Sequence, residues 1–283
     1  MTSDINCVPD RYLSVTRHDI NSWGRVRTIQ QSTSLRTRIG LAILALLVAG
    51  GVSVTYSVQA QPPSSLDGVG RNPSDWTSHL GWRSQFLTTA RGNDAIILVV
   101  ESQASVSAII DSSGLKFSLR FSNSQLSEYF ARTGSPLRSD NVTVVSAGMP
   151  WGAMQVIAVH SAVNRGIFDH DPAVPATCTS SGCGDCRADE SNPGLCSISL
   201  RTSSIDFVVA AVAVNVAPSC GGGTGGGVQG FTTLVHSGQG TFSSIFELDY
   251  KFSNVPGSPV VFGCSGTDVE SIVMDAVALN FGS

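Results

Sequence analysis

The sequence predicts an all-β fold, with a single β-sandwich or jelly-roll domain over residues 84–283 and one hydrophobic helix before it. From Ala95 onward, short apolar or alternating runs are separated by turn residues, which is typical of antiparallel strands. This part of the chain has no convincing amphipathic helix. The composition agrees with a β domain, because 29 residues are glycine and only 13% are charged, against about 25% in an average soluble domain.

Two segments carry the strongest strand patterns. Leu115–Phe121 alternates between apolar and polar residues, so we expect its apolar side chains in the core and Lys116, Ser118 and Arg120 in water. Phe207–Val214 is apolar on both faces, which predicts a central strand covered on two sides. The roughly 220 residues after the leader are within the range of one such domain.

A faint internal similarity suggests two related halves. Phe86–Asp94 leads into the apolar run Ala95–Val100, and Ile198–Asp206 leads into Phe207–Val212. Each pair combines a Thr-containing strand, a turn that ends in Asp and a hydrophobic strand. Chance similarity within a Ser/Thr-rich chain explains the pattern equally well, so both interpretations stay open.

The N-terminal part predicts export. Ile39–Val54 has no charge and follows Arg36 and Arg38. Up to Ala60 the chain has six Arg against three Asp, a net charge of +3, and after it 11 basic against 18 acidic residues, a net charge of −7. A basic leader before an acidic body is typical of a chain whose N-terminus starts in the cytosol and whose C-terminal part is exported.

Three interpretations of this leader stay open. It is a signal peptide cleaved after Ala60, because Val58-Gln59-Ala60 offers small residues at a cleavage site. Alternatively it is an uncleaved anchor, since 20 residues just span a bilayer, or a pilin-type leader cut after Gly40. The predicted organisation is a basic cytosolic leader (1–38), a signal peptide or transmembrane anchor (39–60), a linker and lead-in (61–83) and an extracellular domain (84–283).

Strand and turn signatures recur over most of residues 84–279. They are Leu87–Thr89, Asn93–Asp94, Ile97–Val100, Asp111–Leu115, Phe168–Asp169, Asp171–Pro172, Pro175–Thr177, Asp206–Val209 and Asp275–Ala276. This set resembles a group of secreted or cell-surface β-sandwich proteins of unassigned role that are frequent in archaea. The resemblance implies an exported sandwich at the cell surface. The Cys-rich segment and the Gly-rich loop depart from that pattern and inherit no role from it.

Six of the seven cysteines lie in the part predicted to be exported. They are Cys178, Cys183, Cys186, Cys196, Cys220 and Cys264. An even number outside the cell favours three disulfides, and we favour pairing within the first four and a bridge between Cys220 and Cys264. The alternative is a zinc site, because Cys183 and Cys186 form a C-x-x-C. A redox centre is disfavoured, since no βαβ pattern surrounds this motif.

The long connection Ser161–Ser197 is acidic. Asp169 and Asp171 offer oxygen ligands for Ca²⁺, but the D-x-D-x-D-G spacing of a calcium loop is missing, so we favour a solvated loop. We therefore expect no cofactor, with Ca²⁺ as the alternative and Zn²⁺ behind it. His160 could meet Asp169 in space, but no G-x-S-x-G elbow supports a catalytic triad.

Candidates for glycan contact and for catalysis are few. A glycan-binding surface needs exposed aromatic side chains, for which Trp76, Trp82 and Trp151 are candidates. Asn141 begins an N-x-T sequon inside a predicted strand, so it is a glycosylation site only if its face is exposed. The candidates for a glycosidase pair are Glu101, Glu128, Glu247 and Asp249. For Glu128 and Asp249 we favour surface charge over catalysis.

These observations predict a non-enzymatic protein of the cell surface, tethered or secreted, that binds glycans, a surface layer or neighbouring cells. The alternatives are a structural subunit of an extracellular filament or layer, and a carbohydrate-active jelly-roll enzyme. The expected partners are a glycan or surface protein, and the membrane if the leader is uncleaved. Nucleic acid is excluded, because only two residues, Lys116 and Lys251, are lysines and no basic cluster is present.

Overall fold

The computed structural model describes residues 65–71, 81–123, 125–148, 152–163, 166–179, 195–214, 219–220, 230–237, 245–265 and 269–280. These residues form sixteen strands within one compact unit, Ala60–Ser283. The ranges just given contain no helix, and hence none that is long and apolar enough to cross a bilayer. The all-β prediction is therefore confirmed for them, whereas the predicted helix at 39–60, with the cleavage site at Ala60, lies outside the described residues.

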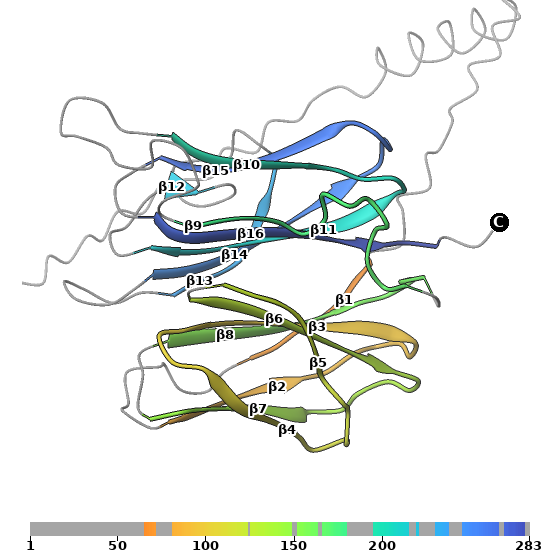
Figure 1. The fold of residues 1–283 in the computed structure, drawn as a ribbon. Helices are drawn as coiled ribbons and strands as arrows, with labels where there is room; N and C mark the ends of the chain where they lie inside the picture. Colours follow the sequence, from red (N-terminus) through yellow and green to blue (C-terminus); the bar gives the residue numbers. More distant parts are fainter. Residues whose placement is uncertain are drawn as a thin grey trace, which may run out of the picture. The chain divides into compact units, whose positions relative to one another are not determined.

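The first eight strands form two antiparallel sheets, which we call inner sheet 1 and outer sheet 1 (Figure 1). Inner sheet 1 has the order β1 (Leu66–Val69), β8 (Gly152–Val159), β3 (Asp94–Ser102), β6 (Leu126–Thr133) and β5 (Ser118–Ser122). Outer sheet 1 has the order β2 (Trp82–Leu87), β7 (Asp140–Ser146) and β4 (Val106–Asp111). Together these strands make up the first repeat.

The last eight strands form inner sheet 2 and outer sheet 2, which are also antiparallel. Inner sheet 2 has the order β9 (Ala176–Thr179), β16 (Val269–Ala278), β11 (Asp206–Val214), β14 (Ile245–Ser253) and β13 (Thr232–Ser237). Outer sheet 2 has the order β10 (Leu195–Arg201), β15 (Pro259–Ser265) and β12 (Ser219–Cys220). These strands make up the second repeat.

The two repeats have the same topology. Adding eight to each strand number of inner sheet 1 and outer sheet 1 gives the strand orders of inner sheet 2 and outer sheet 2. Asp94 and Asp206 start the equivalent strands β3 and β11, and both side chains are fully buried. The internal similarity that the sequence suggested, with these two Asp residues in register, is therefore confirmed.

One backbone contact recurs in both repeats, although the direction of its hydrogen bond differs. Thr89, in the turn before β3, donates its N–H to the carbonyl of Leu137, and the carbonyl of Thr202, before β11, accepts the N–H of Gly257. In both repeats this threonine thus ties the turn before the central strand to the loop before the seventh strand of the repeat. Thr89 and Thr202 therefore hold corresponding places in the two repeats.

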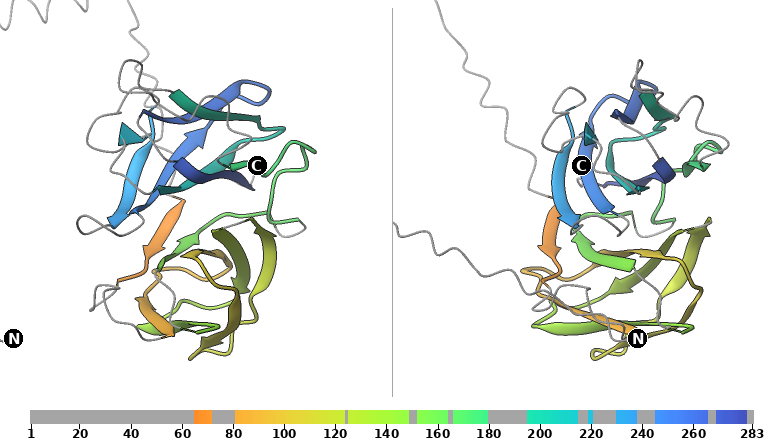
Figure 2. Two further views of the ribbon diagram at one scale, coloured as in Figure 1. Left: turned by 60° about the vertical axis from the view of Figure 1, so that its left-hand side comes forward. Right: turned by 90° about the vertical axis from the view of Figure 1, so that its left-hand side faces the viewer.

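Three hydrophobic cores separate four layers of sheet, in the order outer sheet 1, inner sheet 1, inner sheet 2, outer sheet 2 (Figures 1 and 2). The middle core joins the two inner sheets, for example Ile97 and Val99 of β3 with Phe207 and Val209 of β11. Since each inner sheet contacts a core on both faces, every residue of β3 and of β11 is buried. The predicted central strand Phe207–Val214 is confirmed.

Two local expectations need correction. β5 begins only at Ser118, and its pairing with β6 is shifted between Leu119 and Phe121. This shift breaks the predicted alternation, so that Leu119 is 55% exposed and Arg120 is half-buried. Leu66–Val69 lies in the segment expected to be a linker but forms β1, because it pairs with β8 and its apolar residues reach the middle core.

Candidate functional site

The outward face of outer sheet 1 combines aromatic residues with uncharged polar ones. Along β2, Arg83, Gln85 and Leu87 are buried, so the alternation of the strand turns Trp82 and Phe86 outward. Trp82 is 51% exposed and Phe86 is 43% exposed. Two large rings on one strand of an exposed face are uncommon in a protein surface without a partner.

Cross-strand pairing extends this face over all three strands. Trp82 lies opposite Val145, Ser84 opposite Thr143, and Phe86 opposite Asn141. The outward residues of the three strands are Trp82, Ser84 and Phe86 on β2, Asn141, Thr143 and Val145 on β7, and Ala108 and Ile110 on β4. We call these eight residues the aromatic face, and none of them is charged.

Two hydroxyl groups lie between the rings, and Asn141 adds an amide opposite Phe86. The Oγ of Ser84 and the Oγ1 of Thr143 are 2.6 Å apart and share a hydrogen bond. Asn141 donates its backbone N–H to the Oγ of Ser112 at 2.8 Å and is half-buried on the face. Ile110 adds an apolar side chain that is 58% exposed. The face therefore offers flat apolar area beside groups that donate and accept hydrogen bonds.

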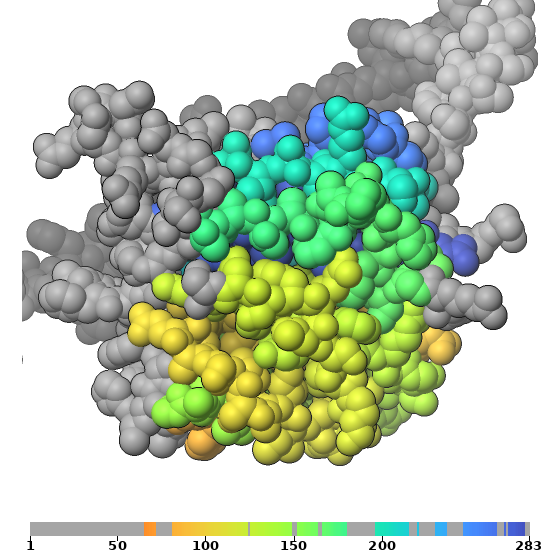
Figure 3. Space-filling view, in the orientation of Figure 1, coloured from red at the N-terminus to blue at the C-terminus, as the bar shows by residue number. Residues whose placement is uncertain are grey.

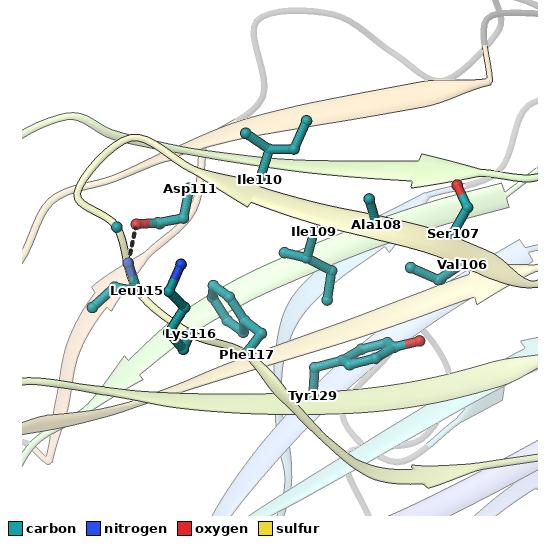
Figure 4. Close-up of a pocket in the computed structure, with 11 residues that line it drawn as sticks. Val106, Ser107, Ala108, Ile109, Ile110, Asp111, Leu115, Lys116, Phe117 and Tyr129 are labelled. Atoms are coloured by element: carbon teal, nitrogen blue, oxygen red, sulfur yellow. Dashed lines mark hydrogen bonds between the residues drawn. The ribbon is translucent and has the colours of Figure 1, made fainter.

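A pocket of about 450 Å³ adjoins the face at its β4 edge (Figure 4). Ile109, Phe117 and Tyr129 line its apolar side, where the core of the first repeat is open between β4 and β6. Ile110 points to the other side of β4, toward the aromatic face (Figure 4). This volume lies in the range of small-ligand sites, about 300–1,000 Å³.

Asp111 fixes the turn that borders this pocket. Its carboxylate accepts the N–H of Leu115 at 2.7 Å, the bond drawn in Figure 4. Burial and the neighbouring carboxylate of Asp140 raise the pKa of Asp111 to about 6. Asp140 in turn accepts the hydroxyls of Ser112 and Ser113, so the β4–β5 turn is held by side chains of two strands.

Of the three tryptophans predicted to contact a glycan, only one lies within the described residues. Trp82 belongs to the aromatic face, whereas Trp76 and Trp151 lie outside the described residues. Phe86 and Ile110 were missed by sequence reasoning. The alternation of Trp82–Leu87 could have revealed Phe86, but Ile110 joins the face only through the register of β4 with β7.

The predicted bridge between Cys220 and Cys264 is confirmed. It links β12 to β15 in outer sheet 2, where the two residues are cross-strand partners. Cys178 and Cys196 are disulfide-bonded too. Cys183 and Cys186, and with them the zinc alternative, lie outside the described residues.

Asp169 acts as a hydrogen-bond acceptor for a turn. It is buried, and its two carboxylate oxygens accept the backbone N–H of Asp171 and the N–H and hydroxyl groups of Ser203 and Ser204. Asp171 accepts the N–H of Ala173. The described part of the chain holds no group of three His, Cys, Asp or Glu residues that could bind a metal ion.

The carboxylates considered for catalysis are buried. Glu101, Glu128, Glu247 and Asp249 are each at most 1% exposed, so the expectation of surface charge for Glu128 and Asp249 is wrong. Their strands place them inside the layers: Glu128 on β6 pairs with Val99, which belongs to the middle core. None of the four lines the pocket of Val106–Asp111, Phe117 and Tyr129 or the one lined by Lys116, Arg132 and residues 166–170.

Glu128 belongs to a charged cluster between the two repeats. Arg120 donates to Asp275 with its Nε 2.8 Å from Oδ2 and its Nη2 3.3 Å from Oδ1. Burial and the charge of Asp275 raise the pKa of Glu128 well above its ordinary value, and burial also raises that of Asp275. If Glu128 is protonated and hydrogen-bonded to Asp275, the single negative charge of Asp275 balances the positive charge of Arg120.

Carboxyl pairs recur at equivalent positions of the repeats. Asp94 of β3 has Asp67 beside it, and Asp206 of β11 has Asp169 beside it. Burial and then the neighbouring carboxylate raise the pKa of Asp206 to about 7, and burial raises that of Asp94. His160 bonds to Asp94, with its Nδ1 2.8 Å from Oδ1, and not to Asp169.

Glu247 of β14 forms a further pair with Asp249. Burial and the charge of Asp249 raise the pKa of Glu247 to about 7. The Nδ1 of His236 lies 2.5 Å from its Oε2. Both carboxylates, Glu247 and Asp249, are buried in the interior of the second repeat.

Comparison with known proteins finds no matching family model, no matching curated protein and no matching solved structure. The chemistry of the aromatic face is therefore the basis for a functional assignment.

Proposed function

We propose that this chain is an exported, non-enzymatic protein that binds glycans at the cell surface through the aromatic face. Aromatic rings stack on the flat apolar faces of sugar rings, and hydroxyl and amide groups bond the sugar hydroxyls. The aromatic face offers both on one sheet, with Trp82 and Phe86 beside the Ser84 and Thr143 hydroxyls. The absence of charge from its eight residues favours a neutral glycan.

We also propose that each repeat is a jelly roll, so that two jelly rolls stand in tandem where the sequence suggested one domain. The nested pairs β1–β8, β2–β7 and β3–β6 support this, since a jelly roll folds the two ends of the chain onto each other in this way. Strands 1 to 4 of each repeat also alternate between the inner and the outer sheet.

Export is supported by the disulfides. A bridge such as Cys220–Cys264 persists in oxidising compartments and is rare in the cytosol. The basic leader before an acidic body agrees with this location. Whether the 39–60 segment is cleaved or remains as an anchor is decided by mass spectrometry of the native N-terminus.

The observation that carries the proposal is the exposure of Trp82 and Phe86 on one uncharged face. The test is depletion of the protein from solution by insoluble cellulose and chitin. Trp82→Ala and Phe86→Ala should each weaken binding by about tenfold or more, since interface aromatics are frequent hot spots. Val261→Ala, on the outward face of outer sheet 2 and 40% exposed, is the matched control and should bind like the natural protein. Equal binding by all three variants would refute the proposed face.

A second candidate function, a subunit of a filament or surface layer, is favoured by one observation. β4 is the last strand of outer sheet 1 among the described residues, and an outer strand can pair with a strand of another copy. Light scattering of the purified chain distinguishes the two functions. Concentration-dependent polymers that Ile110→Lys dissolves would favour the subunit, and a monomer at all concentrations would exclude it.

A further inference from the structure

A second concave site lies where the first repeat meets the segment that precedes β9. It is a groove of about 550 Å³ between β5 and β6 on one side and residues 166–170 on the other. Figure 3 shows the face of the molecule on which the yellow residues of these strands adjoin the green residues of that segment. The groove is separate from the aromatic face, which belongs to the other sheet of the first repeat.

Cationic side chains converge on this groove although the exported part of the chain is acidic overall. Lys116, Arg120 and Arg132 line it, together with His170. After Ala60 the chain has only 11 Lys and Arg against 18 acidic residues. Three of those 11 cationic residues line this one groove. The groove is therefore positively charged, although the chain after Ala60 has a net negative charge.

Two of the three cations are available to a ligand. Arg120 is held by Asp275 and lies over the ring of Phe168, 4.1 Å from its centroid. No ion pair within the described residues involves Lys116 or Arg132. Arg132 donates one Nη2 hydrogen bond to the carbonyl of Val163, which holds the guanidinium without neutralising it.

The one carboxylate that lines the groove is already saturated. Asp169 accepts hydrogen bonds from Ser203, Ser204 and the N–H of Asp171, so it does not compete for Lys116 or Arg132. Burial raises this acid's pKa, but those donors outweigh burial and keep the pKa of Asp169 below its ordinary value. The groove keeps an excess of positive charge.

The groove has an apolar wall beside its cationic side chains, which favours a ligand that combines a ring with an anionic group. Phe130 and Phe168 meet edge to face at 5.2 Å between ring centroids and provide an apolar wall. Gly166 has a φ of +73°, and a Cβ there would come within 2.8 Å of the Cε1 of His170, so glycine lets the His170 ring close that end. The Ser118 hydroxyl adds a neutral polar contact.

We propose that this groove binds the carboxylate of an acidic sugar unit, of the uronic acid type. The planar guanidinium of Arg132 matches the two oxygens of a carboxylate, and Lys116 adds a second positive charge. The sugar ring lies against Phe130, and Ser118 meets a ring hydroxyl. The inference goes beyond the proposed function and does not rest on it, because it uses other residues and a charged ligand.

The test is a calorimetric titration of the full-length chain with glucuronate, glucose and inorganic sulfate at low ionic strength. Glucuronate should bind, glucose should not, and sulfate should bind more weakly because it lacks the ring. Arg132→Gln should weaken glucuronate binding by about tenfold, as expected for a hydrogen bond to a charged group. Lys116→Gln should weaken it by a smaller factor, and raised salt should weaken it further.

Arg138→Gln is the matched control, since Arg138 is an exposed arginine of the first repeat that does not line the groove. It should bind glucuronate like the natural protein, and so should Trp82→Ala. Glucose binding as well as glucuronate, or both groove variants binding like the control, would overturn the proposal. Sulfate binding as tightly as glucuronate would also overturn it, because the groove would then trap any anion. Lys116 is exposed, so its variant keeps the test valid even if Arg132→Gln fails to fold.

Discussion

The two repeats share their strand order but differ in the exposed side chains and in the last strand of their outer sheets. Outer sheet 1 exposes Trp82 and Phe86, and its last strand β4 has six residues. In outer sheet 2 the residue equivalent to Phe86 is Ser199, which lies opposite Val261. There the last strand, β12, has two residues, and the Cys220–Cys264 bridge ties it to β15.

This difference suggests that the outer sheet of the second repeat serves stability and that of the first repeat serves binding. The second repeat fastens its outer sheet covalently, and the exposed residues of its strand β10 are Ser197, Ser199 and Arg201. Among the described residues, the first repeat leaves an apolar face uncovered and ends outer sheet 1 at β4, which is a cost in water unless a partner uses it. In a pair of equivalent folds, the half that departs from an inert surface is the better candidate for function.

The largest expected effect concerns the joint between the repeats. Arg120→Ala leaves Asp275 and Glu128 buried without a cation, which should lower the free energy of unfolding by about 3–5 kcal/mol. Urea unfolding followed by far-UV circular dichroism measures it. Arg138→Ala, at an exposed arginine of the same repeat, should change it by less than about 0.5 kcal/mol. A loss at Arg120 no larger than that at Arg138 would show that the cluster does not hold the repeats together.

The next effect concerns the second repeat alone. Replacing Cys220 and Cys264 by Ala opens a bridge with a sequence separation of 44, and should lower the free energy of unfolding by about 2–4 kcal/mol. The tryptophans of the body, at 76, 82 and 151, all precede β9, the first strand of the second repeat. Trp82 lies on β2 of the first repeat, and a destabilisation confined to the second repeat should leave the tryptophan emission maximum unchanged in the absence of urea. A shifted maximum would contradict the idea that the bridge acts locally.

A smaller effect tests a feature that the repeats share. Asp206 keeps its proton up to a pKa of about 7 when folded, against 3.8 ordinarily. Its stabilisation is therefore fully present below about pH 4 and is lost as the pH rises through about 7. Asp206→Asn should flatten the fall of stability over this range by up to about 1.4 kcal/mol per pH unit. Thermal unfolding from pH 4 to pH 8 measures the slope.

Asp94→Asn is the matched variant in the first repeat. Burial raises the pKa of Asp94 as well, so this substitution should flatten the profile in the same direction. Profiles of both variants that run parallel to that of the natural protein would mean that neither carboxyl is protonated in the folded state.

The smallest effect on stability is expected at the aromatic face. Phe86→Ala removes a ring that is 43% exposed, and should change the free energy of unfolding by about 0.5 kcal/mol or less. Phe207→Ala, a fully buried phenylalanine, should cost about 3–5 kcal/mol. Comparable losses at the two positions would indicate that Phe86 serves packing and not binding.

The sequence predicted local patterns well because they depend on near neighbours. The run of apolar residues predicted the buried strand β11, and the positions of the cysteines predicted the Cys220–Cys264 bridge. The similarity around Asp94 and Asp206 pointed to two related halves. It was not decisive, because a strand, a turn and a strand form in many unrelated proteins.

What the sequence could not predict depends on the stacking of sheets. Glu128 and Asp249 look like surface charges on alternating strands, but each inner sheet has a core on both faces, so no face is left for water. Ile110 joins the aromatic face only through the pairing of β4 with β7. The groove at Arg132 requires residues 116–132 to meet residues 166–170, a contact that no local pattern encodes.

The most direct test of the proposed role of the aromatic face in glycan binding is a nuclear magnetic resonance titration with soluble chitohexaose. The Trp82 indole N–H signal, assigned by its loss in Trp82→Phe, should shift with added ligand, together with the amides of Phe86, Thr143 and Ile110. The amides of Ser199 and Val261, at the equivalent place in the second repeat, should stay unchanged. Shifts that gather on β10 and β15 instead, with Trp82 unaffected, would contradict the account.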